Sequence, residues 1–196
     1  MADNFTNVNQ KATLRDSAAI RWIALLLLAL GMFCAYIFMD ILSPIKDLMQ
    51  ETRGWDSLAF GTMQGAETFL NVFVFFLIIA GIILDKMGVR FTAVLSGAVM
   101  LVGGIIKYYA VSESFVGSGL EVWFNNHLNY IPGFDELGVS PFYNGMPAAA
   151  KMAAVGFMIF GCGAEMAGIT VSRGIVKWFK GRETALAMGS EMALAR

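Results

Sequence analysis

Two ionisable residues, Glu165 and Arg196, stand in otherwise apolar stretches of the chain. Glu165 precedes Trp178 by 13 positions, and Arg196 follows Glu183 by 13. If both stretches are helices joined by a turn at 178–183, a rise of about 1.5 Å per residue puts both charges roughly 20 Å from that turn. An ionised side chain at that membrane depth costs at least about 2.5–3.5 kcal/mol, so each should face a cavity or a partner. The spacing favours contact with a charged solute and leaves open a Glu–Arg ion pair that only joins helices.

Further polar residues inside apolar stretches are candidates for lining a solute pathway. Glu67 and Asn71 are four positions apart, as are Tyr36 and Asp40, so each pair lies on one face of a helix. Glu67, Asn71 and Tyr36 are therefore predicted to join Glu165 and Arg196 as solute-binding residues. Ordinary solvation near the outer mouth of a pathway is the alternative for Asp40 and Glu67.

Apolar helices must position these residues, and the composition agrees with that requirement. Of the 196 residues, 57% are hydrophobic and 15% are charged, and the mean hydropathy is +0.64. A soluble domain averages about 45–50% apolar and about 25% charged residues. The apolar residues form long runs between short charged segments, which is typical of an all-α polytopic membrane protein. Helices are predicted at about 18–42, 58–84, 91–110, 149–177 and 184–196, after a cytoplasmic tail at 1–17.

The basic residues predict the orientation of these helices. Lys11, Arg15 and Arg21 precede the first helix, and Lys86 and Arg90 lie between the second and third. The positive-inside rule therefore places the N-terminus on the cytoplasmic side. The expected location is a cell membrane, either a bacterial inner membrane or a plasma membrane. The first apolar run is too long for a cleavable signal and is predicted to stay as an anchor. Fewer basic residues fall on the opposite side, namely Lys46, Arg53, Lys107 and Lys151.

The long connection at 111–148 is predicted to lie outside the cell. It exceeds the usual limit of about 12–15 residues for connections without structure of their own. Because it is rich in aromatic residues, it could form a small folded cap or remain a mobile aromatic loop. It contains His127, the only histidine of the chain, so no zinc site is predicted. Neither a metal nor another cofactor is expected.

A ten-residue segment joins the second and third predicted helices. It reads Gly-Ile-Ile-Leu-Asp-Lys-Met-Gly-Val-Arg, and its glycines permit a tight turn and close helix approach. The segment resembles the signature loop of the major facilitator superfamily, Gly-x-x-x-Asp-Arg/Lys-x-Gly-x-Arg/Lys. Phe91 stands where that family usually has one more basic residue, and an ordinary positive-inside loop is the alternative. The resemblance implies a conformational latch between two transporter halves, with the matching residues Gly81, Asp85, Lys86, Gly88 and Arg90.

A second motif occupies the turn between the fourth and fifth predicted helices, where an interfacial tryptophan and basic residues anchor helix ends. Together with Glu165 and Arg196, this turn resembles the lysosomal dipeptide transporter branch of the same superfamily and its bacterial homologues. The resemblance implies that Glu165 binds the amine of a dipeptide and that Arg196 binds its carboxylate. The superfamily's usual basic motif in the middle of the fourth helix is not clear here, since Arg173 lies near the cytoplasmic end. The residues of the turn are Trp178, Phe179, Lys180, Gly181, Arg182 and Glu183.

The resemblance implies that the chain is a partial N-terminal six-helix half of a major facilitator superfamily transporter, cut within the fifth helix. Its partners would be a missing C-terminal half, the lipid bilayer and a small solute held between the halves near the midplane. The expected function is transport of small polar solutes, most of all dipeptides or similar zwitterions, by alternating access, for which this chain alone is not competent. A formal charge of −1 gives no basic surface for nucleic acid.

Two other classes of function remain as alternatives. A non-transporting membrane receptor or assembly subunit would use the loop at 111–148 to bind a partner, and this loop rather than the midplane charges would then determine activity. An intramembrane enzyme would need paired aspartates, a Ser–His pair or a histidine-rich metal site. A single histidine in a loop excludes most of these, so the sequence does not predict an enzyme.

Overall fold

The computed structural model describes residues 17–181 and 183–196, so most of the tail expected at 1–17 and Arg182 of the 178–183 turn lie outside the described residues. Within that part of the chain, all regular secondary structure is helical, which confirms the predicted all-helical class. The elements are α1 (Ala18–Asp40), the short 3-10 helix η2 (Ser43–Ile45), α2 (Lys46–Arg53), α3 (Ser57–Phe73), α4 (Phe76–Ala110), α5 (Gly119–His127), α6 (Ala148–Phe179) and α7 (Thr184–Ala195).

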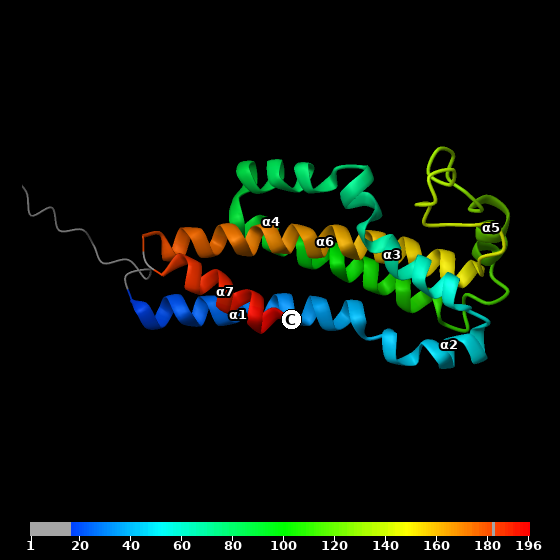
Figure 1. The fold of residues 1–196 in the computed structure, drawn as a ribbon, viewed down its shortest axis with the longest axis horizontal. Coiled ribbons are helices and arrows are strands. Elements are labelled where there is room, and N and C mark those ends of the chain that lie inside the picture. The colour runs from blue at the N-terminus through cyan, green and yellow to red at the C-terminus, as the bar shows by residue number, and fades with distance from the viewer. Residues whose placement is uncertain (1–16, 182) are drawn as a thin grey trace, which may run out of the picture.

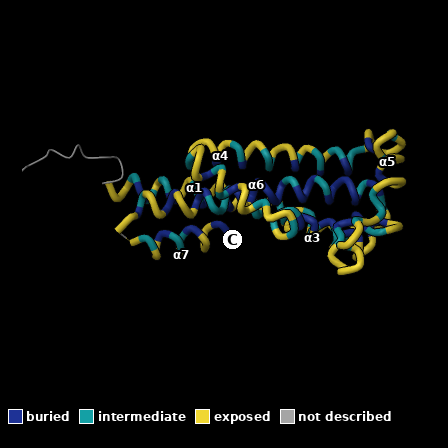
Figure 2. Tube along the Cα trace, turned by 90° about the horizontal axis from the view of Figure 1, so that it is seen from above, coloured by how far each residue is buried: buried dark blue, intermediate teal, exposed yellow. Residues whose placement is uncertain are grey.

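Three segments are long and apolar enough to cross a membrane. They are Ala18–Arg53, which contains α1, η2 and α2, together with α4 and α6. The long helices lie along the long axis of the molecule (Figure 1), and α6 packs against α1, α3 and α4. α6 is buried along most of its length, whereas α1 and α4 expose many residues (Figure 2). These exposed faces are largely apolar, as expected for helices whose outer surface contacts lipid.

Small residues allow α6 to approach its neighbours closely. Gly156 and Gly163 lie against α4, and Gly161 lies against the backbone of Glu67 on α3. A Cβ added at any of these glycines would overlap the facing helix. Close contact through small residues is the usual way in which membrane helices pack. The contact at Gly161 places Glu67 beside α6, one helical turn before Glu165.

The helix expected at 58–84 is divided in the structure. α3 ends at Phe73, and Phe75 takes a left-handed conformation with φ 55° before α4 begins. No glycine or proline marks this point, so no local signal predicts it. The rings of Phe69 and Phe73 each lie 5.2 Å from the ring of Phe134 in the 111–148 connection. This long-range contact holds the end of α3 and outweighs the local preference for a continuous helix.

The connection expected between 84 and 91 is shorter than predicted. α4 consists of two arms, residues 76–87 and 89–110, which meet at Gly88 with φ 81° and ψ 170°. Glycine takes this conformation without the strain that a Cβ would cause. The chain reverses direction there (Figure 1), so the first arm runs back along the outside of the bundle.

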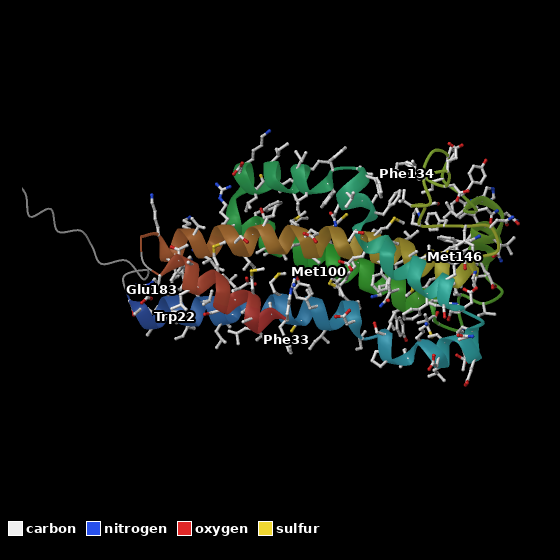
Figure 3. All side chains as sticks on the ribbon, viewed as in Figure 1. Trp22, Phe33, Met100, Phe134, Met146 and Glu183 are labelled. Carbon is white, nitrogen blue, oxygen red and sulfur yellow. The ribbon has the colours of Figure 1, made fainter. Side chains whose placement is uncertain are left out.

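Residues 111–147 form a folded cap at one end of the bundle. Its helix, α5, is capped at its N-terminus by Ser118, whose hydroxyl accepts a hydrogen bond from the backbone N–H of Glu121 at 3.2 Å. Phe134 and Met146 mark this end of the molecule in Figure 3, and Trp22 and Glu183 mark the opposite end. The structure therefore shows a folded cap and not an open loop. Its buried side chains, packed in one cluster with Trp55, are Phe115, Phe124, Phe142 and Met146.

Polar contacts attach the cap to the helices, one of them the 2.7 Å hydrogen bond that Arg53 Nη2 of α2 donates to the carbonyl oxygen of Val111. The Lys151 Nζ of α6 is buried and donates hydrogen bonds to the carbonyl oxygen of Phe124 at 3.3 Å and to Asn129 Oδ1 at 2.9 Å. The Tyr143 hydroxyl donates to Asp56 Oδ1 at 3.4 Å, at the start of α3. Burial, followed by the charge of Asp56 and this hydrogen bond, raises the pKa of Tyr143 above its ordinary value of 10.0. The cap is thus held by α3 and α6, the same helices that carry Glu67 and Glu165.

Candidate functional site

Two cavities lie beside α1, and both reach α7. The first has a volume of about 520 Å³ and the second a volume of about 200 Å³, and Tyr36 and Arg196 line both of them. The first cavity is otherwise lined from α1, η2, α3 and α6, and the second from α1, α6 and α7. Their other polar lining residues are Asp40, Ser43, Gln64 and Glu67 in the first cavity and Glu165, Ser172 and Glu191 in the second.

Helix α7 places Arg196 between the two cavities. Ala187 and Ala195 are buried on α7 and pack in the cluster that also contains residues of α1 and α6. The guanidinium carbon of Arg196 lies 5.5 Å from the centroid of the Tyr36 ring, which is a cation–π contact. Arg196 therefore contributes a positive charge to both cavities, in which the other charged lining residues are carboxylates.

Glu165 faces the second cavity from the most buried helix. It is exposed, although its neighbours Ala164 and Met166 are only 6% and 1% exposed. Arg196 lines the same cavity, yet no ion pair joins the two side chains in the described part of the chain. The direct Glu–Arg pair that the sequence left open is therefore not observed, and both groups remain able to meet a solute.

The other predicted solute-binding residues do not all line a cavity. Tyr36 and Glu67 line the first cavity, whereas Asn71, one turn beyond Glu67 on α3, lines neither cavity. Both polar side-chain atoms of Asn71 are buried, and among residues 17–181 and 183–196 neither has a hydrogen-bond partner. Leaving buried polar atoms unpaired costs about 1–3 kcal/mol, and nothing in the structure explains this asparagine.

Lys107, which the sequence predicts only as one of the basic residues of the outer side, is buried in the structure. Lys107 is 6% exposed within α4. Its Nζ lies 3.3 Å from the centroid of the Phe157 ring and donates a hydrogen bond of 3.4 Å to the carbonyl oxygen of Phe38. No pattern near Lys107 in the sequence distinguishes it from a lysine at a helix end.

The segment predicted as a latch contains one ion pair. Asp85, at the end of the first arm of α4, pairs with Arg173 on α6. Gly88 makes the reversal, and Lys86 and Arg90 are exposed on either side of it. The pair joins the outer arm to the central helix at the end of the bundle opposite the cap.

We expect the Asp85–Arg173 pair to stabilise this contact only modestly. The two side chains are 71% and 48% exposed, and exposed ion pairs contribute about 0.2–1 kcal/mol. A double-mutant cycle with Asp85→Asn and Arg173→Gln, read from unfolding in detergent, should give a coupling energy in that range. Lys86→Gln is the control for a change in charge alone. A coupling energy of zero would show that the pair does not hold the arm.

The turn between α6 and α7 is compact. The Phe179 side chain is 1% exposed, and its ring lies 5.5 Å edge-on from the ring of Trp22 on α1. The Thr184 hydroxyl donates a 2.7 Å hydrogen bond to the carbonyl oxygen of Phe179. Gly181 and Glu183 both have positive φ, which lets the chain reverse within a few residues. This reversal brings α7 back along α1 and so brings Arg196 to Tyr36.

Comparisons of the chain with protein-family models, curated proteins and solved structures find no match. No group of three or more histidine, cysteine, aspartate or glutamate residues that could hold a metal ion occurs among residues 17–181 and 183–196. Function is therefore inferred from the two cavities and the charges that line them.

Proposed function

We propose that the chain is part of the N-terminal half of a transporter of the major facilitator type, which carries small zwitterionic solutes and dipeptides in particular. The observation that supports this most is the position of Arg196, between two cavities whose other charged lining residues are carboxylates. A zwitterion carries one ammonium and one carboxylate group, so a guanidinium flanked by carboxylates is complementary to it. The proposed role is binding and release of the solute, without catalysis.

Each charged residue has a specific role in this proposal. Arg196 binds the carboxylate of the solute, because a guanidinium can donate two parallel hydrogen bonds to it. Glu165 binds the ammonium group from the second cavity. Glu67 and Tyr36 extend the binding surface into the first cavity. At about 520 Å³ this cavity lies within the range of about 300–1,000 Å³ that is usual for small-molecule sites.

Alternating access requires a second transporter half as a partner. Glu165 supports such a partner because it is exposed within a largely buried stretch of α6. Facing lipid as an ion would cost it at least about 2.5–3.5 kcal/mol, whereas a facing half with water and solute between would remove this cost. The segment from Gly81 to Arg90 would latch the two halves in one conformation, and its contact with Arg173 would be part of that latch.

The proposed setting is a bacterial inner membrane or a plasma membrane that the chain crosses several times, with its N-terminus in the cytoplasm. Three candidate spans and the basic residues near one end of the bundle support it. The cap would then lie on the outer side, at the mouth of the pathway.

A receptor or assembly subunit is the second candidate function, and the cap favours it. α5 exposes an apolar surface on which Leu120, Val122 and Trp123 are 46%, 57% and 47% exposed. Such a surface fits a protein partner. This alternative predicts that substitutions on α5 abolish activity and that substitutions at Glu165 and Arg196 do not.

The decisive experiment is a dipeptide panel tested by thermal unfolding of the detergent-purified full-length gene product. A ligand at 100 times its Kd stabilises the state that binds it by about 2.7 kcal/mol, which is readily measured as a rise in Tm. Glu165→Gln and Arg196→Ala should each lose this rise, because each removes one of the two charge-assisted contacts.

Glu113→Gln is the matched control, since Glu113 is an exposed carboxylate of the cap that lines neither cavity. It should keep the full dipeptide-dependent rise in Tm. If no dipeptide raises Tm, the assignment to dipeptides is wrong, and sugars and organic anions become the next solutes to test. If a dipeptide binds equally well to all variants, the roles of Glu165 and Arg196 are wrong.

A further inference from the structure

The outward side of α5 is apolar, although this helix belongs to the cap. Leu120 and Trp123 are three positions apart, so they share a helix face, and both are exposed. Val116, just before the helix, and Val122 are also exposed. On its inward side α5 packs through Phe124, which belongs to the cluster that joins the cap to α3 and α6. The four exposed residues together are called the α5 face.

The α5 face carries no formal charge. Glu121 is the one acidic residue of α5, which contains neither lysine nor arginine. Its Oε2 atom accepts a 2.6 Å hydrogen bond from the backbone N–H of Gly117, at the start of the helix. Trp123 is flanked by His127, whose ring stacks on the indole with centroids 5.1 Å apart. An exposed apolar surface of this kind indicates contact with a protein or with a membrane.

The level of α5 along the bundle favours the membrane. Arg173 of α6 pairs with Asp85, and both side chains are exposed. Because exposed charges are costly in hydrocarbon, this pair marks one boundary of the membrane core. Lys151 precedes Arg173 by 22 positions on the same helix, which is about 33 Å along its axis. The core is about 30 Å thick, so Lys151 lies at its other boundary. Lys151 Nζ donates a 3.3 Å hydrogen bond to the carbonyl oxygen of Phe124, which places α5 at this boundary as well.

The second arm of α4 leads to the same level by a different route. Residues 89–110 also extend about 33 Å from the reversal at Gly88. At the end of this arm the ring of Tyr109 meets that of Phe115 edge-on, with centroids 5.9 Å apart. Val116 is the next residue, so the α5 face begins directly beyond the end of a membrane-spanning helix. It thus continues the exposed apolar surface of α4.

We propose that the α5 face is a lipid-binding surface that seats the cap in the interfacial layer of the bilayer, between the headgroups and the start of the acyl chains. Tryptophan is enriched at this depth, where its ring contacts both layers. An apolar helix face in the interface binds by burying its area among the lipids. α5 packs beside α6, so its exposed side is turned toward the surrounding bilayer. The proposal rests on α6 crossing the membrane and not on transport.

Quenching of tryptophan fluorescence tests the proposal on the full chain in phosphatidylcholine vesicles. The chain has four tryptophans, and subtracting the emission of Trp123→Phe from that of the wild type isolates Trp123. Lipids that carry bromine near the headgroup end of their acyl chains quench an indole that they touch. They should remove most of the Trp123 emission, whereas iodide in the buffer should remove little of it. Trp123→Leu provides the same subtraction if Trp123→Phe does not fold.

Asn125→Trp, made in the Trp123→Phe chain, is the matched control. Asn125 is also exposed on α5, but it lies about 160° around the helix from Trp123. A tryptophan there should be quenched by iodide and hardly by the brominated lipid. Stronger lipid quenching at position 123 than at 125 therefore supports a specific lipid-binding face and excludes a general collapse of the cap onto the membrane.

Two other results would overturn the proposal. If iodide quenches Trp123 and the brominated lipid does not, the α5 face is in contact with water. If neither quencher reaches Trp123, a protein covers the face, as the receptor alternative requires, and loss of this protection on dilution of the chain in lipid would identify the protein as a second copy. Since no solute is present, failure of this test is distinct from failure of the dipeptide panel.

Discussion

Phe115→Ala should unfold the cap and lower the free energy of unfolding by about 3–5 kcal/mol. The Phe115 side chain is 0% exposed, and its ring meets those of Tyr109 and Phe124 edge-on, with centroids 5.9 and 6.4 Å apart. It lies in the cluster that joins the cap to α3 and α6. Truncation would leave a void in this cluster. The short helix α5 is the only helix within the cap, so little regular structure remains to compensate. Limited proteolysis within 111–147, together with thermal unfolding in detergent, measures the effect.

Val116→Ala is the matched control for this prediction. Val116 is adjacent in the chain but 60% exposed, so its truncation should change the free energy of unfolding by no more than about 0.5 kcal/mol. Faster cleavage of the cap should therefore occur in Phe115→Ala alone. Equal cleavage rates in the two variants would mean that the aromatic cluster does not hold the cap.

That Glu165 and Arg196 come to the same cavity could be predicted from the sequence because helix rise and a tight turn are local properties. Equal spacing on either side of the 178–183 turn predicts Glu165 and Arg196 at similar depth, and the structure lines one cavity with both. The all-helical character follows from the apolar runs in the same way and is confirmed. That the two residues bind a solute stays a prediction.

Lys107 and the break at Phe75 could not be predicted because both depend on residues distant in the chain. Lys107 has the sequence context of an interfacial lysine, and only the packing of Phe38 and Phe157 around it shows that it is enclosed. The break at Phe75 accompanies ring contacts with Phe134, some sixty positions away. Local propensity is a weak guide where such tertiary contacts compete with it.

Gly161→Ala should lower the free energy of unfolding by about 3 kcal/mol, at the upper end of the range for overpacking. The added methyl group would overlap the backbone carbonyl of Glu67 and stand 2.7 Å from its Cγ. A flexible side chain could turn away from such an overlap, but a backbone atom moves only with its helix. α3 must therefore separate from α6, and Glu67 then leaves its place in the first cavity. Thermal unfolding in detergent measures the loss of stability.

Gly65→Ala on α3 is the matched control, since nothing lies within 4 Å of a Cβ added there. An alanine in an open helical position is more favourable than glycine by about 0.5–1 kcal/mol, so this variant should be as stable as the wild type or slightly more stable. A loss of stability in Gly161→Ala together with a gain in Gly65→Ala would show that the backbone contact between α3 and α6 determines where Glu67 lies. If both variants are as stable as the wild type, that contact tolerates a methyl group and does not determine where Glu67 lies.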